Sequence, residues 1–211
     1  MIPVRLDPAG WPFIGGAVVL AALSAVTVGA WLALVFLVLA TFFAFFFRDP
    51  DRVVRAGQNE VLSPADGRVL VAGTVEPGAA PPGEWQQISI FLSPMNVHVN
   101  RVPASGQITR VSYQPGRFLP AYHKEAAATN ERSEIWIDHQ GVFVVARQIV
   151  GILARRVVCR AKVGDRVQAG DRYGVMKFGS RMDIFVPPTA ELRVQVGQDV
   201  RGGETVIAVL H

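Results

Sequence analysis

Two related stretches decide the fold: Val163-Gly-Asp-Arg-Val-Gln-Ala-Gly-Asp171 and Val196-Gly-Gln-Asp-Val-Arg-Gly-Gly-Glu204. Both follow the pattern Val-Gly-x-x-Val-x-x-Gly and end on an acidic residue, at a fixed offset of 33 residues. Each copy is typical of a strand, a tight turn and a second strand. Two such hairpins stacked face to face predict a mainly β domain, a flattened β-barrel or sandwich. The segment between them, residues 176–181, is then expected to be an exposed turn.

Short β-branched and aromatic runs, separated by Gly and Pro, fill the chain before the repeat. Runs of this length and composition predict strands. They lie at residues 67–73, 87–92, 134–137 and 142–145. Residues 121–132 are rich in Ala and are expected to form a short helix or an ordered loop. We therefore predict one globular domain over residues 48–211, long enough to bury a core.

The N-terminal residues 11–47 contain no charged side chain. One helix of this length would measure about 55 Å, whereas the apolar core of a bilayer is about 30 Å thick. We therefore predict that residues 1–47 form a helical hairpin in a membrane, with its break near Thr27-Val28-Gly29-Ala30. Three arginines follow within residues 48–55, which places the rest of the chain on the cytoplasmic side of the cell membrane. The sequence leaves open whether the hairpin spans the bilayer or dips into it.

Charge and cysteine content narrow the function classes. The formal net charge is +4 and the pI about 9.7, but the Lys and Arg residues are scattered, which argues against nucleic acid and fits an anionic lipid surface. Cys159 is the only cysteine, so we expect neither an internal disulfide nor a thiolate zinc site, and no metal. Half of all residues are hydrophobic and the mean hydropathy is +0.30, which excludes a purely soluble or a disordered chain.

The segment after the first repeat copy resembles biotinyl and lipoyl carrier domains. Those domains carry their cofactor on a lysine of a central hairpin, and Lys177 has that position. The following Phe178-Gly179-Ser180-Arg181 departs from the carrier pattern. We interpret the likeness as a shared fold, and keep a membrane-anchored carrier module that uses Lys177 as the alternative function.

Six further segments carry a second resemblance, which runs from about Phe46 to the C-terminus. In order along the chain they are Phe46–Arg52, Ser63–Gly67, Phe91–Pro103, Asn130–Arg132, Gly151–Arg156 and Phe178–Asp183. Together, behind an apolar N-terminus, they resemble phosphatidylserine decarboxylase of the short bacterial and archaeal type. The resemblance implies a membrane-associated carboxy-lyase of phospholipid biosynthesis that converts phosphatidylserine to phosphatidylethanolamine and carbon dioxide. A decarboxylase of a related serine lipid, such as an archaetidylserine, would share every segment and stays an alternative.

The resemblance also implies a proenzyme that cleaves itself between Gly179 and Ser180. The Ser180 hydroxyl would attack the Gly179 carbonyl, and elimination and hydrolysis would leave a covalent pyruvoyl group as the cofactor. That group would form a Schiff base with the serine headgroup and act as an electron sink when carbon dioxide leaves. Residues 1–179 would become the large chain and residues 180–211 the small chain. Whether the paired chains form a homo-oligomer is left open.

His98 and Asp66 complete the catalytic group that the resemblance implies. His98 would be the acid and base that activates Ser180, and Asp66, in a Pro-Ala-Asp-Gly turn, would orient it. Longer family members have a second histidine where this chain has Arg101. The sequence therefore leaves open whether His98 serves both self-cleavage and decarboxylation.

Candidates for substrate binding are Asn100, His123 and Arg132. Arg132 would engage the substrate carboxylate or phosphate, and a salt bridge with Glu134 is the alternative. Arg155-Arg156 is expected to be a solvated strand edge or a contact to lipid phosphates.

Overall fold

The structure, a computed structural model, describes residues 5–152, 157–177 and 179–211. Arg155-Arg156, for which a solvated edge or a lipid contact is expected, lies outside the described residues, as does Phe178 of the cleavage-site segment. The contacts divide the chain into two compact units, Met1–Asp51 and Arg52–His211.

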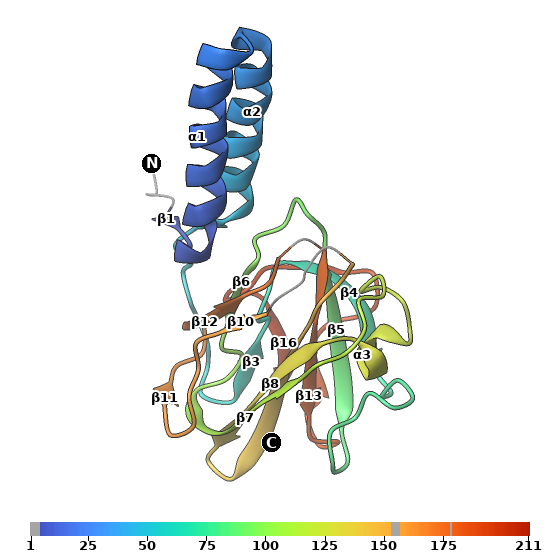
Figure 1. The fold of residues 1–211 in the computed structure, drawn as a ribbon. Coiled ribbons are helices and arrows are strands. Elements are labelled where there is room, and N and C mark those ends of the chain that lie inside the picture. The colour runs from blue at the N-terminus through green and yellow to red at the C-terminus, as the bar shows by residue number, and fades with distance from the viewer. Residues whose placement is uncertain (1–4, 153–156, 178) are drawn as a thin grey trace. The chain divides into compact units, whose positions relative to one another are not determined.

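The N-terminal unit is the predicted helical hairpin. Two apolar helices pack against each other (Figure 1), and the chain reverses at Gly29, whose φ of +135° is accessible mainly to glycine. The break therefore lies where the sequence predicts it. The elements of this unit are β1 (Arg5–Leu6), η1 (Pro8–Gly10), α1 (Trp11–Thr27), α2 (Ala30–Phe46) and β2 (Arg48–Asp49).

Both helices expose apolar side chains. Val26 is 88% and Trp31 84% exposed. By length and composition the helical segment Pro8–Thr27 could cross a membrane, and Ala30–Phe46 is a shorter apolar helix. Helices that expose apolar side chains to this extent are suited to lipid rather than to water, which is consistent with membrane association.

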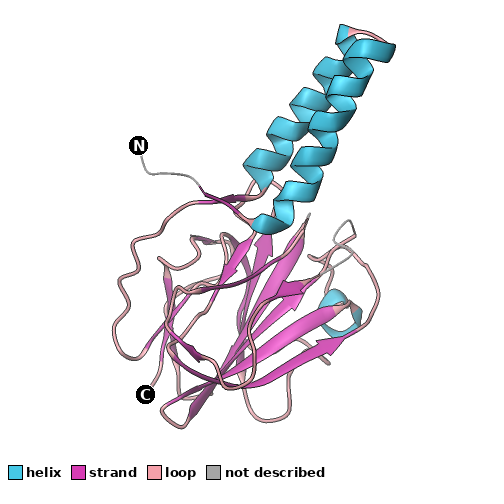
Figure 2. Ribbon diagram, turned by 60° about the vertical axis from the view of Figure 1, so that its left-hand side comes forward, coloured by secondary structure: helices cyan, strands magenta, loops and turns pink. Residues whose placement is uncertain are grey.

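The second unit is built on an eight-stranded antiparallel sheet (Figure 2). Its strand order is β11-β7-β8-β9-β13-β5-β4-β15, so β13 lies in the interior although it comes late in the chain. The strands are β4 (Gly67–Gly73), β5 (Gln86–Leu92), β7 (Gly106–Gln114), β8 (Arg132–His139), β9 (Val142–Ile149), β11 (Arg166–Val167), β13 (Ser180–Val186) and β15 (Asp199–Val200).

The two repeat copies occupy the two edges of this sheet. β11 of the first copy pairs with β7, and β15 of the second copy pairs with β4. Each copy then turns into a strand of a small sheet, with the order β10-β12-β6 or β14-β16-β3. Strand, turn and strand thus follow one another as predicted, but the two strands of a copy pair with strands elsewhere and not with each other. The remaining elements are β3 (Glu60–Leu62), β6 (Val99–Arg101), α3 (Ala126–Thr129), β10 (Val158–Cys159), β12 (Arg172–Val175), β14 (Glu191–Leu192) and β16 (Val206–Val209).

The large sheet has a core on each face. On its inner face, side chains such as Ile90 and Ile184 pack with residues of the small sheets, including Tyr173. On its outer face, a smaller cluster around Phe185 is covered by Ala79 and Ala127 among others. The mainly β fold with a helical hairpin is therefore confirmed, although the sheets do not close into a barrel within the residues that the structure describes.

Candidate active site

Ser180 is the first residue of β13 and is fully buried. It lies opposite Leu92 of β5, and its Oγ has no hydrogen-bond partner among the described residues. Gly179 precedes it with a φ of +69°, in the left-handed region that favours glycine. The expectation of an exposed turn over residues 176–181 is wrong for the described residues, because Met176 is buried in the core and Ser180 and Arg181 are buried in β13, which runs between two neighbouring strands.

The side chain of Ser180 lies on the inner face of the sheet. Side chains alternate between the faces of a strand, so Ser180 and Met182 share a face. Met182 pairs with Gln148 of β9, which brings Gln148 to the same face and diagonally across from Ser180. The Nε2 of Gln148 donates a hydrogen bond of 2.8 Å to Oδ1 of Asn100 in β6. The sequence motifs indicate Asn100 as a candidate, but they do not include Gln148.

Ser180, Gln148 and Asn100, the last from β6 of a small sheet, each have a buried polar atom without a partner in the described part of the chain. The atoms are Ser180 Oγ, Asn100 Nδ2 and Gln148 Oε1. An unpaired buried donor or acceptor costs about 1–3 kcal/mol, so each such atom needs an explanation. Asn100 Nδ2 is a donor and Gln148 Oε1 an acceptor, and a bound polar group could pair with both.

His98 is buried and directly precedes β6. Its carbonyl oxygen accepts a hydrogen bond of 3.1 Å from the N–H of Met176, which ties it to the segment that leads to Gly179. Its Nδ1 lies 3.0 Å from the carbonyl oxygen of Asn96. Because a carbonyl only accepts hydrogen bonds, this contact requires a proton on Nδ1 and makes Nε2 the basic nitrogen of the neutral ring.

Asp66 contacts groups outside this cluster. Its Oδ2 lies 2.7 Å from Nη2 of Arg52, and its Oδ1 accepts a hydrogen bond of 2.8 Å from the N–H of Gly202. The His98 nitrogen that an orienting aspartate would hold is bonded to the carbonyl of Asn96. None of these contacts joins Asp66 to His98, and an orienting role of Asp66 stays a prediction.

Arg132 lies on the outer face of the sheet, because it is in register with Ile149 and so with Arg181, the neighbour of Ser180. Its Nη1 donates a hydrogen bond of 2.6 Å to the carbonyl of Ala128. Burial, and next the charge of Arg147, lowers the pKa of Arg132. A substrate contact of Arg132 stays a prediction, and it would be made on the face opposite to the Ser180 side chain.

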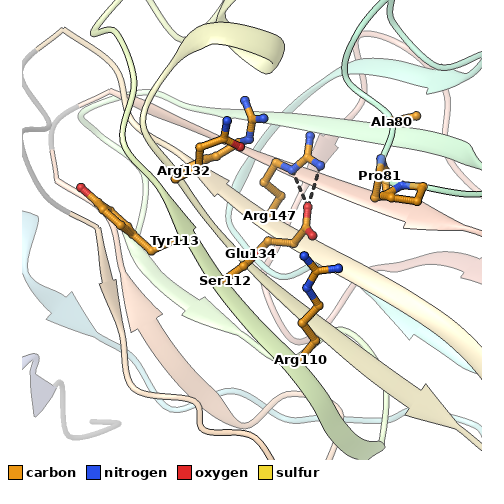
Figure 3. A pocket seen from close by; sticks show the side chains of 10 residues that line it. Ala80, Pro81, Arg110, Ser112, Tyr113, Arg132, Glu134 and Arg147 are labelled. Carbon is orange, nitrogen blue, oxygen red and sulfur yellow. Dashed lines mark hydrogen bonds and ion pairs between the residues drawn. The ribbon is translucent and has the colours of Figure 1, made fainter.

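A pocket of about 330 Å³ surrounds Arg132 (Figure 3). Arg110, Glu134 and Arg147 also line it, and the close view shows the guanidinium group of Arg147 directed at the carboxylate of Glu134. The carboxylate of Glu134 pairs with Arg147 at 2.6 Å, and its second oxygen accepts a hydrogen bond from Trp136. Glu134, for which a salt bridge with Arg132 was the alternative, is thus paired with Arg147.

His123 and Lys177 differ in their exposure to solvent. His123 is exposed, and its Nδ1 accepts a hydrogen bond of 3.4 Å from the N–H of Glu125. Lys177 is half-buried, two residues before Gly179. Substrate binding by His123 stays a prediction.

Arg181 and Asp183 form a buried ion pair on the outer face, with 2.6 Å between Arg181 Nε and Asp183 Oδ1. Arg181 also contacts Glu76 and Ser89, and Gln87 donates to Asp183. Burial alone would lower the pKa of Arg181, but the charge and hydrogen bonds of Asp183 and the contact with Glu76 outweigh it and raise the pKa. These contacts hold the Arg181 side chain at the start of β13.

Comparison with known proteins identifies the family. Residues 39–208 match the family described as phosphatidylserine decarboxylase. The chain belongs to the phosphatidylserine decarboxylase family. A phosphatidylserine decarboxylase proenzyme from Geotalea uraniireducens is 41% identical over 202 residues, which cover 95% of this chain and 94% of that protein. A second, from Chlorobium phaeobacteroides, is 44% identical over 210 residues, which cover 98% and 92%.

Family membership confirms the resemblance drawn from the sequence. The family is one of decarboxylases, which are lyases. The name proenzyme, which both relatives carry, fits a precursor that is processed. Groups of three or more His, Cys, Asp or Glu side chains that could hold a metal ion are absent from the part of the chain that the structure describes.

Proposed function

We propose that the protein decarboxylates phosphatidylserine to phosphatidylethanolamine after cutting itself between Gly179 and Ser180. The observation that carries the proposal is the buried Ser180 hydroxyl, which has no hydrogen-bond partner among the described residues and directly follows a left-handed glycine. A hydroxyl held in this way does not stabilise the fold, so its value lies in chemistry.

Self-cleavage would use His98, Ser180 and Gly179 of this chain. Nε2 of His98 takes the proton of Ser180, and the oxygen attacks the carbonyl carbon of Gly179. The C–N bond breaks as a C–O ester bond forms. Elimination then releases residues 1–179 with a terminal carboxylate and leaves dehydroalanine at position 180. Water replaces its nitrogen, ammonia leaves, and a pyruvoyl group remains on residues 180–211.

The surrounding residues fit such a group. Gln148 shares the inner face with residue 180, and Asn100 of β6 accepts a hydrogen bond from Gln148. Each of the two has one buried polar atom without a partner in the described chain. We assign them to the serine headgroup, with Asn100 Nδ2 donating to a carboxylate or phosphate oxygen and Gln148 Oε1 accepting from a donor. The pyruvoyl group supplies the electron sink for the loss of carbon dioxide. His98 then returns a proton to the carbon that lost the carboxylate.

The strand ladders would keep the two chains together after cleavage. Residues 180–211 contain β13, which pairs with β5 and β9 on its two sides. They also contain β15 and β16, which pair with β4 and β3 of the large chain. Cutting one bond before β13 leaves all these hydrogen bonds in place, so we expect the small chain to stay bound.

The helical hairpin would hold the enzyme at a bilayer, where its lipid substrate resides. Its exposed apolar faces suit lipid. The arginines within residues 48–55 directly follow the hairpin, and arginines beside an apolar segment favour the cytoplasmic side of a membrane.

The decisive experiment is the mass of the purified protein under denaturing conditions. We expect two fragments, residues 1–179 and residues 180–211, with the small fragment blocked at its N-terminus by the pyruvoyl group. The alternative function, a carrier module, requires one uncut chain with added mass on Lys177. A single chain without added mass would contradict both.

Replacing His98 by glutamine is expected to slow self-cleavage by about 10²–10⁴-fold, because a general base contributes about that factor. The measurement is the fraction of cut chain against time after synthesis, by denaturing mass spectrometry. The decarboxylation rate per cut chain is measured on the same samples, and tells whether His98 serves both reactions.

His139 provides the matched control. It is also buried, and its Nδ1 also lies close to a backbone carbonyl, that of Ser105 at 2.6 Å. It ends β8 at the end opposite to Arg132 and so lies far from Ser180. We expect His139→Gln to cleave at the wild-type rate. Equal slowing in both variants would exclude His98 as the base.

A further inference from the structure

Gly151 lies directly against the carbonyl group of Gly179. A Cβ atom on residue 151 would be 1.9 Å from the carbonyl oxygen of Gly179 and 3.0 Å from its carbonyl carbon. The Gly151 hydrogen that takes the place of a side chain therefore points at this oxygen, the geometry of a weak C–H···O contact. The oxygen occupies space that exists only because residue 151 has no side chain.

The backbone before Gly151 is held by a buried amide. Asn130 is fully buried, and its Nδ2 donates to the carbonyls of Val150 at 2.9 Å and Leu119 at 2.8 Å. Its Oδ1 accepts a hydrogen bond of 3.0 Å from the N–H of Leu119. The N–H of Val150 donates to the carbonyl of Glu131 at 3.1 Å. Both polar backbone groups of Val150 are thus fixed, and the position of Gly151 follows from them.

The carbonyl on the other side of this contact belongs to a residue with much conformational freedom. Gly179 has no side chain to restrict its dihedral angles, and its φ of +69° does not by itself set the direction of its carbonyl, which depends on ψ. Attack by Ser180 requires one orientation of that carbonyl. A rigid surface against the oxygen supplies it.

We propose that Gly151 is a positioning residue for self-cleavage, whose backbone, held by Asn130, sets the orientation of the Gly179 carbonyl that Ser180 attacks. The proposal rests on the proposed self-cleavage at this bond. It assigns Gly151 and Asn130 a role before the cut only, because afterwards residue 179 ends in a free carboxylate that is no longer tied to β13.

Replacing Gly151 by alanine is the direct test. Gly151 does not lie in the left-handed region, so alanine can adopt its backbone conformation and the contact with Gly179 is what changes. A displacement of about 1 Å in a reacting group costs about 100-fold in rate. We expect the half-life of the uncut chain to rise by about that factor, measured by denaturing mass spectrometry on the soluble protein.

Gly106→Ala is the matched control. A Cβ on Gly106 would lie 2.2 Å from the carbonyl oxygen of Asp138, a comparable clash with a backbone carbonyl at another place in the same sheet. We expect this variant to lose thermal stability but to cleave at the wild-type rate. A second readout is turnover per cut chain, which we expect to stay within about threefold of wild type in Gly151→Ala, because the contact is no longer needed after the cut.

Asn130→Asp is the second variant, and it adds no atom near the carbonyl. It removes the donor to the carbonyls of both Val150 and Leu119. The bond to Val150 is the one that fixes Gly151, so we expect cleavage to slow by about tenfold, the value of that one hydrogen bond. If Gly151→Ala does not yield soluble protein, the cleavage rate of Asn130→Asp tests the role of Gly151 instead.

The outcomes separate the two proposals. An uncut wild-type chain would overturn the proposed function. Cut wild type together with wild-type rates in Gly151→Ala, or in Asn130→Asp if only that variant is soluble, would overturn only the role of Gly151. Equal slowing in Gly106→Ala would also overturn it, since the effect would then be general destabilisation.

Discussion

Replacing Ser180 by alanine yields one uncut chain of 211 residues and no measurable release of carbon dioxide from phosphatidylserine. Alanine has no oxygen to attack the Gly179 carbonyl and cannot become a carbonyl itself. Both the cut and the reactive group are lost together, so we expect turnover to fall by at least ~10⁶-fold, a large part of an enzyme's total acceleration. The measurements are denaturing mass and labelled carbon dioxide from carboxyl-labelled substrate.

The same substitution should leave the fold intact. The Ser180 hydroxyl is buried and has no hydrogen-bond partner among the described residues, so its removal breaks no known contact and relieves an unpaired polar group. We expect the thermal midpoint of the uncut variant to equal or exceed that of an uncut wild-type sample taken early after synthesis. Loss of activity through unfolding is thereby distinguished from loss of chemistry.

Ser133→Ala is the control for this variant. Ser133 is a buried serine of β8 that pairs with Gln148 and so lies on the same inner face as Ser180. We expect Ser133→Ala to be cut normally and to retain most of its activity. An uncut Ser133→Ala, or an uncut Ser180→Ala that still decarboxylates at more than a hundredth of the wild-type rate, would contradict the assignment of Ser180.

The sequence predicts the elements whose cause is local. The helical hairpin follows from an uncharged stretch with a glycine at its middle, and Gly29 indeed takes a positive φ. The strands at residues 67–73 and 87–92 follow from β-branched runs, and the structure has strands there. Which strands pair with one another is not determined by the local sequence. The two repeat copies look like separate hairpins in the sequence, yet each borders a different edge of one sheet.

In the candidate site, too, single residues can be predicted from the sequence, whereas contacts between distant segments cannot. Gly179, Ser180 and His98 come from motifs that resemble those of the family, and the chemical role of each belongs to the proposed function. Gln148 is missed by that reading, although a signal exists: it is a polar residue at an inward position of an alternating apolar strand, two residues after Ala146. Which atoms meet cannot be read from motifs at all. The partners of Asp66 and the contact of Gly151 depend on segments that are far apart in the chain.

Arg181→Met is expected to destabilise the second unit by about 3–5 kcal/mol, because it leaves a charged partner buried without its counterion. Asp183 is 0% exposed and would retain only Ser89 and Gln87 as donors of the present network. A loss of this size lowers the thermal midpoint by roughly 10 °C in a unit of this length. The variant is made in the Ser180→Ala chain in detergent, so that an altered cut does not change the protein under study.

Two comparisons test whether the stability lost in Arg181→Met comes from a buried unpaired charge: an exposed ion pair and a double variant. Arg193 pairs with Glu191 at 2.8 Å, but the two side chains are 52% and 51% exposed, so Arg193→Met should cost less than about 1 kcal/mol. Adding Asp183→Leu to Arg181→Met removes the stranded carboxylate, and we expect it to recover at least half of the lost stability. If the double variant were less stable than Arg181→Met alone, the two effects would merely add, and the penalty would come from packing at the start of β13 and not from an unpaired charge. The distinction bears on the proposed reaction, because Arg181 directly follows Ser180, whose hydroxyl would attack the Gly179 carbonyl.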